Sequence, residues 1–282
     1  MGGILFTTVV AKFATKGNRM ENAKTREIYK ENFVEYLLCL AMDIGEGMLK
    51  CGAEVSRVED TIERVCRAYG AAHVEVFSII SVINASVRMP DGTFSSQMRR
   101  VRSSGYDLTM LEKFNALSRE VCRSTPALDD FDAEIHRIRS SVTYRWWVQM
   151  LSLMAICSGF TVFFGGDIID AIIAAVIGAA ISVLEIFPSK YINSLMKTLI
   201  SSLIIAMLCA IAALIIKDLD TGAIIMGSIM PLVPGIAFGT AMRDLLLGEL
   251  VSGSLKALQS ILQALMIAFA YLVVAAICGG AI

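Results

Sequence analysis

The chain has 282 residues, of which 56% are hydrophobic and 18% charged, and its formal net charge is −1. Ordinary soluble proteins are about 45–50% apolar even with glycine counted, so this composition does not fit a soluble protein. The near-neutral charge and the lack of basic clusters with interleaved aromatic residues give no support for nucleic-acid binding.

Most of the charge lies in the first half of the chain. Before Trp146 there are 20 of the 25 Lys and Arg residues and 19 of the 26 Asp and Glu residues. This distribution predicts a charged N-terminal region followed by a region that enters a lipid bilayer. The two histidines, His73 and His136, are far apart, and the seven cysteines form no CxxC pair. We therefore predict no metal, no cofactor and no disulfide framework.

Residues 1–25 are expected to form a tail ahead of the first domain. The apolar run at the start is broken by Lys12 and has no charged region before it, which does not fit a signal peptide. Met20 is a second plausible start, because a strongly polar helical pattern follows it.

Residues 26–141 predict a small cytoplasmic α+β domain of order αα-βββ-αα. Apolar residues at three- and four-residue steps predict four helices, with Gly52 as the left-handed cap of the first. Between the helices, a segment rich in β-branched residues with a turn at Pro90-Asp91-Gly92 predicts strands. The predicted helices are Arg26–Lys50, Ala53–Tyr69, Leu108–Cys122 and Leu128–Ser141, and the strands lie within Ala72–Val101.

Residues 142–282 predict an all-α bundle of five transmembrane helices. A bilayer core of about 30 Å needs about 20 helical residues, and each apolar stretch meets that length. The predicted spans cover about residues 146–164, 168–187, 195–216, 221–247 and 251–277. Basic residues precede the first span and follow the second. The positive-inside rule therefore predicts a cytoplasmic N-terminal domain and a C-terminus outside.

The fourth span is predicted to be broken by Pro231, Pro234 and Gly235. Proline in a helix interior removes a donor and clashes with the preceding turn, at a cost of about 3 kcal/mol or more. Membrane proteins tolerate such breaks and use them to build transporter sites. Amides freed after Gly235 can attract an anionic group such as a substrate carboxylate. A compatible alternative is close helix packing through Gly235 and Gly239.

Residues at every fourth position of this span are expected to share one face. They are Gly227, Pro231, Gly235, Gly239 and Arg243. In the last span, a polar stripe is expected to face protein or a water-filled pathway, or to serve only in hydrogen bonds between helices. It consists of Ser252, Lys256, Gln259 and Gln263.

Three further ionisable residues are candidates for function. Arg243 and Asp244 are expected near the cytoplasmic interface, either as an orientation anchor or at a substrate entrance. Glu185 is a candidate for proton coupling, and an interfacial carboxylate is its alternative. The predicted substrate-binding residues are Gly227, Pro231, Pro234, Gly235, Gly239, Gln259 and Gln263. The predicted pathway or coupling residues are Glu185, Arg243, Asp244 and Lys256.

Two sets of segments resemble the threonine/serine exporter family. One is Gly52-Ala53-Glu54-Val55-Ser56-Arg57-Val58-Glu59. The other is Pro234-Gly235 with Arg243-Asp244 and Leu250-Val251-Ser252-Gly253. The order of a soluble domain before five spans is also similar, so the resemblance covers about residues 27–280.

The resemblance implies a proton-driven exporter, in the inner (plasma) membrane, of small amino acids or of dicarboxylates such as succinate. Fused members of the family carry roughly twice as many spans. The resemblance therefore implies that this chain is the larger half of a split exporter and needs a second small integral-membrane subunit. The alternative function is a membrane-anchored regulatory or scaffold protein without transport activity. No nucleophile elbow, P-loop or HExxH motif is present, so we do not expect an enzyme.

Overall fold

The protein is described by a computed structural model that covers residues 32–102, 105–141, 144–185, 193–216 and 218–278. The chain divides into two compact units, Met1–Ser141 and Val142–Ile282. The predicted tail, residues 1–25, lies outside the described residues.

The described residues of the first unit form four helices and three strands in the predicted order αα-βββ-αα, and this prediction is confirmed. The elements are α2 (Phe33–Lys50), α3 (Val55–Ala68), β1 (His73–Ile79), β2 (Val82–Arg88), β3 (Phe94–Arg100), α4 (Leu108–Ser124) and α5 (Leu128–Ser140). Gly52 has a φ of +86°, as the predicted left-handed cap requires. Gly92 has a φ of +89° in the turn between β2 and β3.

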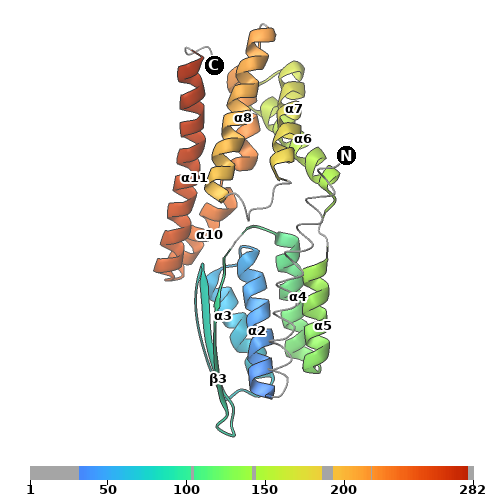
Figure 1. Ribbon diagram of the computed structural model, residues 1–282, viewed down its shortest axis with the longest axis vertical. Helices are drawn as coiled ribbons and strands as arrows, with labels where there is room; N and C mark the ends of the chain where they lie inside the picture. Colours follow the sequence, from blue (N-terminus) through green and yellow to red (C-terminus); the bar gives the residue numbers. More distant parts are fainter. Residues whose placement is uncertain (1–31, 103–104, 142–143, 186–192, 217, 279–282) are drawn as a thin grey trace. The chain divides into compact units, whose positions relative to one another are not determined.

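The strands form an antiparallel sheet in the order β1-β2-β3. Its register places Asn84 between Phe77 and Met98. Alternate residues such as Ile83 and Ala85 are buried, and the sheet packs on α2 and α3. Within this unit, α4 and α5 lie on the side of α2 away from β3 (Figure 1). The opposite sheet face is open, with Phe77 and Met98 64% and 75% exposed.

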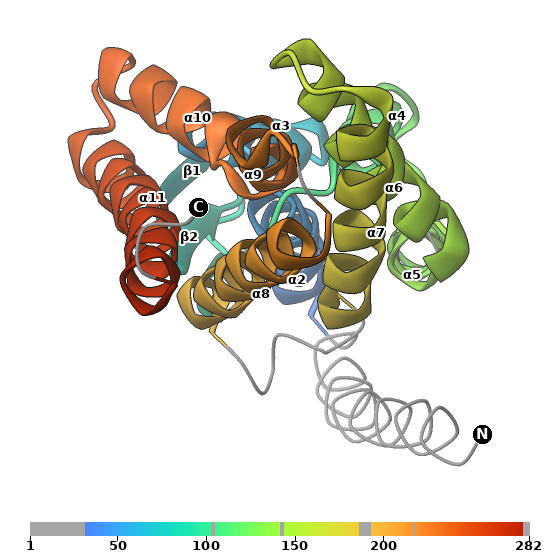
Figure 2. The same cartoon turned by 90° about the horizontal axis from the view of Figure 1, so that it is seen from above.

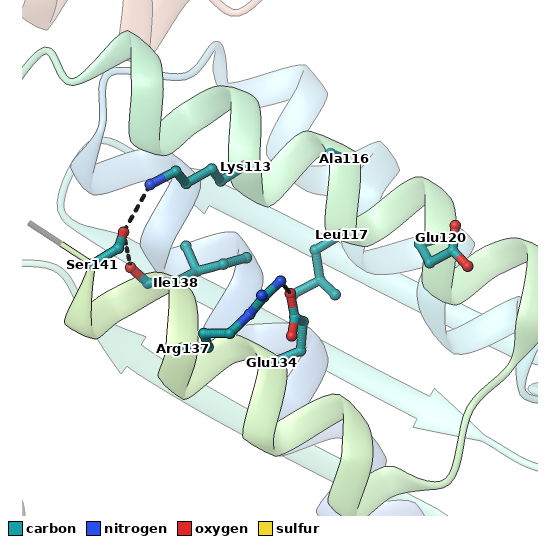
Figure 3. Close-up of a pocket in the computed structure, with 8 residues that line it drawn as sticks. All are labelled: Lys113, Ala116, Leu117, Glu120, Glu134, Arg137, Ile138 and Ser141. Carbon is teal, nitrogen blue, oxygen red and sulfur yellow. Dashed lines mark hydrogen bonds and ion pairs between the residues drawn. The ribbon is translucent and has the colours of Figure 1, made fainter. Parts of the chain in front are cut away.

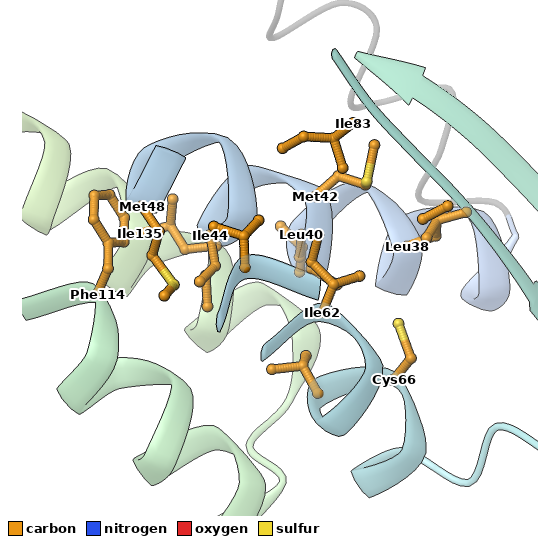
Figure 4. Packing of buried hydrophobic residues seen from close by; sticks show 14 of the residues in the cluster. Leu38, Leu40, Met42, Ile44, Met48, Ile62, Cys66, Ile83, Phe114 and Ile135 are labelled. Carbon is orange, nitrogen blue, oxygen red and sulfur yellow. The ribbon is translucent and has the colours of Figure 1, made fainter. Parts of the chain in front are cut away.

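The core of the first unit joins all of its layers. Met42 of α2, Ile62 of α3, Ile83 of β2, Phe114 of α4 and Ile135 of α5 belong to one buried cluster (Figure 4). Full burial of an apolar side chain of this size contributes about 1.5–3 kcal/mol. The apolar faces that the sequence predicts for these elements therefore pack into a single core.

A buried carboxylate also ties three elements of this unit together. Asp43 of α2 is 3% exposed and pairs with Arg99 of β3 and with Arg139 of α5. Burial lowers the pKa of Arg99, but Asp43, Cys39 and Glu46 raise that pKa by more, so the guanidinium stays charged. The two arginines offset the cost of burying Asp43.

All regular elements among the described residues of the second unit are helices. Its elements are α6 (Trp146–Phe163), α7 (Ile168–Glu185), α8 (Ser194–Ile215), α9 (Thr221–Ile229), the 3₁₀ turn η1 (Met230–Leu232), α10 (Gly235–Leu246) and α11 (Leu250–Ile277). Helix α9 packs among α6, α7 and α8, while α11 packs against α8 and α10 (Figure 2).

The predicted break in the fourth span is confirmed. Helix α9 ends in η1, which contains Pro231, and α10 begins after Pro234 at an angle of 51° to the preceding segment. At the other end of α10, Gly248 with a φ of +93° allows the tight connection to α11. Residues Thr221–Leu246 therefore form two half-helices rather than one rod.

Among the described helices, three are long and apolar enough to cross a membrane: α6, α8 and α11. The bent pair formed by Thr221–Leu232 and Gly235–Leu246 is a fourth candidate, and α7 is a shorter apolar helix. The structure thus supports three or four spans by length and composition, and the fifth span remains a prediction.

Candidate functional site

The bend in the fourth span separates the glycines that were expected to share one face. Gly227 of α9 is buried against Thr161 of α6. Gly235 and Gly239 of α10 are exposed, and an added methyl at either position would meet nothing within 4 Å. The single-face expectation was wrong, because the fourfold spacing holds only along an unbroken helix.

Some of the backbone amides at the start of α10 already donate to nearby backbone carbonyls. Pro234 is the N-cap residue, and the amide of Gly235 donates to the carbonyl of Val233 at 2.8 Å. The amide of Phe238 donates to the carbonyl of Pro234 at 2.9 Å. Any anion site at this terminus therefore depends on the amides between these two.

Asp244 and Lys256 form a buried ion pair between α10 and α11. Lys256 Nζ donates to Asp244 Oδ2 at 2.7 Å, and the two side chains are 9% and 0% exposed. Both residues were predicted as pathway or coupling residues, and the structure brings them together. Removing one partner of such a buried pair leaves an uncompensated charge, which is strongly destabilising.

The buried face of α11 is polar in its first half and apolar in its second. Ser252, Lys256 and Ser260 are buried, followed by Ile267 and Ala270. The Ser260 hydroxyl donates to the Lys256 carbonyl at 2.9 Å. The stripe therefore passes through Ser260, which the sequence reading missed, whereas Gln259 is exposed. A strict four-residue repeat from Ser252 would have found Ser260.

Helix α8 contributes hydroxyl groups that the sequence reading also missed. The side-chain amide of Gln263 donates to the Thr198 hydroxyl at 3.0 Å. Ser201 and Ser202 are buried, and their hydroxyl oxygens have no hydrogen-bond partner within the described part of the chain. Buried polar atoms of this kind are rare and call for a water or a ligand. The close spacing of Thr198, Ser201 and Ser202 in an apolar helix was the available signal.

Two other predicted residues contribute less to this site. Arg243 is exposed on α10, whereas its neighbour Asp244 is buried in the ion pair. Glu185 is the last residue of α7, and its side chain lies outside the described residues. Pro231 and Pro234 are half-buried at the break itself.

A second buried carboxylate in this unit has a structural explanation. Asp170 is 4% exposed in the first turn of α7. Its Oδ2 accepts the amide of Asp167 at 2.9 Å, and the amide of Ala171 donates to the Asp167 carbonyl. The side-chain bond corresponds to one half of a capping box, from the third helical position back to the residue before the helix, so Asp170 fixes the start of α7.

The first unit has a surface groove of about 520 Å³ between α4 and α5 (Figure 3). Lys113 donates to Ser141 at 2.9 Å, and Arg137 pairs with Glu134 in the middle of the groove. Three of the four charged side chains that line the groove are therefore already engaged, and Glu120 alone does not make a convergent set of polar groups for a ligand. Within the described residues, no cluster of histidine, cysteine or carboxylate side chains could hold a metal ion.

Three apolar helices of spanning length and a broken fourth candidate indicate an integral membrane protein. The sequence matches the ThrE family, described as "Putative threonine/serine exporter", over residues 39–278. This match covers most of the chain, so the protein belongs to the ThrE family, as its sequence motifs predicted. ThrE is a family of membrane transport proteins rather than enzymes.

Two curated relatives are similar to the chain. Pheromone-regulated membrane protein 10 of Kluyveromyces lactis is 27% identical over 194 residues, which are 66% of this chain and 20% of the yeast protein. A protein of Mycobacterium tuberculosis named "Probable threonine/serine exporter" is 24% identical over 222 residues, which are 77% of this chain and 41% of that protein. The chain thus spans less than half the length of either relative. No solved structure matches it significantly.

Proposed function

We propose that this protein is a subunit of a secondary transporter that exports a small carboxylate-bearing solute across the inner (plasma) membrane. The candidate solutes are small amino acids such as threonine and serine, or small organic acids such as succinate. The observation that carries the proposal is the broken fourth span, which leads directly into a buried ion pair. A plain membrane anchor needs neither feature, whereas broken helices near charged groups are a recurring way to build transporter sites.

The proposed pathway combines the break with the polar seam beyond it. Pro231, Pro234 and the open glycine face of α10 would form the first binding position of the solute carboxylate, ahead of the buried ion pair. The seam is the set of buried or hydrogen-bonded polar side chains of α8 and α11, namely Thr198, Ser201, Ser202, Ser252, Lys256, Ser260 and Gln263. Hydroxyl and amide groups inside a membrane are costly unless they face one another or a hydrated path. We assign proton coupling to the ionisable residues Glu185, Arg243, Asp244 and Lys256.

The open face of α10 supports the proposed second membrane subunit. Gly235 and Gly239 form a GxxxG patch to which no described helix packs closely, and Arg243 follows on the same face. Such small residues allow another membrane helix to approach closely, and an exposed arginine is unfavourable against lipid. A second small integral-membrane protein would cover this face. The cytoplasmic placement of the first unit and the outside C-terminus stay part of the proposal.

The proposal is tested by straightening the break. In a deletion strain of the native host, Pro234→Ala with Gly235→Leu should abolish efflux of preloaded solute while the protein stays at wild-type level in the membrane. The matched control is Gly159→Ala on α6, where an added methyl meets nothing within 4 Å. Unchanged efflux in the double variant would favour the other candidate function, a regulatory or scaffold protein that does not transport.

A further inference from the structure

Two buried oxygen atoms at the Asp244–Lys256 pair, one on Asp244 and one on Ser252, have no hydrogen-bond partner within the described residues. Asp244 Oδ2 is bonded to Lys256, but Asp244 Oδ1 is buried and has no partner within the described residues. Ser252 lies one helical turn before Lys256 on the buried face of α11, and its hydroxyl also has no partner there. A carboxylate oxygen that is removed from water without a donor is strongly unfavourable.

The charges of the pair match those of a zwitterion. Lys256 supplies a cation and Asp244 an anion, so the closed site has no net charge. An amino acid inserted between them would place its carboxylate on Lys256 and its ammonium on Asp244, and the site would stay neutral. The ammonium group would supply the donor that Asp244 Oδ1 lacks. Charge-assisted hydrogen bonds of this kind are the strong ones.

A dicarboxylate, which has no ammonium group, would fit the ion pair poorly. One of its carboxylates could bind Lys256, but the other would bring a second negative charge beside Asp244 in a buried site. Like charges repel strongly where the surroundings have a low dielectric constant. The pair therefore favours a solute with an ammonium group over one of the same size without it.

We propose that Asp244 is the specificity-determining residue of the exporter, selecting solutes that carry an ammonium group next to a carboxylate. Ser252 assists by offering its hydroxyl oxygen to the same ammonium, and Lys256 holds the carboxylate. This assignment rests on the proposed transport function and chooses between its two solute classes. The alternative is that the ion pair only holds α10 against α11 and has no role in selecting the solute.

The first test uses the wild-type protein, so it does not depend on the folding of a variant. Efflux of radiolabelled serine from preloaded cells of the native host is measured against competing cytoplasmic serine or 3-hydroxypropionate, which has the same skeleton and hydroxyl but no ammonium. We expect 3-hydroxypropionate to compete about tenfold or more weakly, because it leaves Asp244 without its donor. Equal competition by the two compounds would overturn the assignment.

The second test is the ratio of serine efflux to succinate efflux in Asp244→Asn cells, with Asp244→Glu as the conservative control. The asparagine variant should lower this ratio by about tenfold, and the glutamate variant should retain most of it. A clamp with no role in selection would reduce both fluxes in proportion and leave the ratio unchanged, which would overturn the assignment. Wild-type efflux of succinate without serine would also overturn it while leaving the exporter function intact. Wild-type efflux of neither solute would defeat the exporter function itself.

Discussion

Thr161 of α6 occupies the space that a side chain at position 227 of α9 would need. A Cβ atom built on Gly227 would lie 2.5 Å from the Thr161 amide nitrogen and 2.8 Å from its Cα. These are backbone atoms, which cannot rotate away. The close approach of α6 and α9 therefore requires glycine at this position.

We predict that Gly227→Ala destabilises the membrane unit by about 1–3 kcal/mol, the usual cost of overpacking. Gly239→Ala is the matched control, because a methyl there meets nothing within 4 Å. Thermal unfolding of the purified protein in detergent measures both. Equal losses of stability in the two variants would show that α6 and α9 do not meet at Gly227.

Asp43→Asn should destabilise the first unit by about 3–5 kcal/mol, because Arg99 and Arg139 would lose the charge that both contact. Pulse proteolysis of the full chain in increasing urea measures this loss. Asp60→Asn serves as the control, since its pair with Arg64 is exposed and contributes at most about 1 kcal/mol. A stability of Asp43→Asn close to that of the control would contradict the described network.

The stability of the first unit should fall in alkaline solution, partly through Cys66. Burial, with a smaller effect of Cys122, raises the pKa of the Cys66 thiol from 9.0 to about 12. Between these values the unfolded thiol loses its proton while the folded thiol keeps it, so rising pH favours unfolding. At 1.36 kcal/mol per pKa unit the loss reaches roughly 4 kcal/mol by pH 12.

The measurement is the free energy of unfolding from pH 8 to pH 11.5 for wild type and Cys66→Ala. The variant should start less stable because it lacks a buried sulfur, but its dependence on pH should be shallower by about 1.4 kcal/mol per pH unit. Identical slopes for the two proteins would show that Cys66 is not the titrating group.

The Thr198–Gln263 hydrogen bond should contribute a small but measurable coupling between α8 and α11. Double-mutant cycles for such bonds in membranes average about 0.6 kcal/mol and reach about 1.7 kcal/mol. A cycle with Thr198→Val and Gln263→Leu, followed by thermal unfolding in detergent, measures the coupling. Full additivity of the two substitutions would indicate that the side chains do not meet.

Much of the fold could be predicted from the sequence because the deciding signals are local. Apolar periodicity located α2 to α5, and the turn at Pro90-Asp91-Gly92 located the β2–β3 connection. Pro231 and Pro234 located the break, since a missing donor acts on its own helix whatever surrounds it. The family motifs likewise lie in short stretches of the chain.

The site depended on contacts between helices, which the sequence does not specify. Asp244 and Arg243 are neighbours in the chain, yet Asp244 is buried against Lys256 while Arg243 is exposed, and Thr198 meets Gln263 across 65 positions. The bend turned Gly235 and Gly239 away from the packed surface that holds Gly227. By itself the sequence determined which segments are helical, apolar or broken, because those properties follow from neighbouring residues. Only the tertiary structure decided which side chains meet, because that depends on the rotation of each helix about its axis and on the angle at the break.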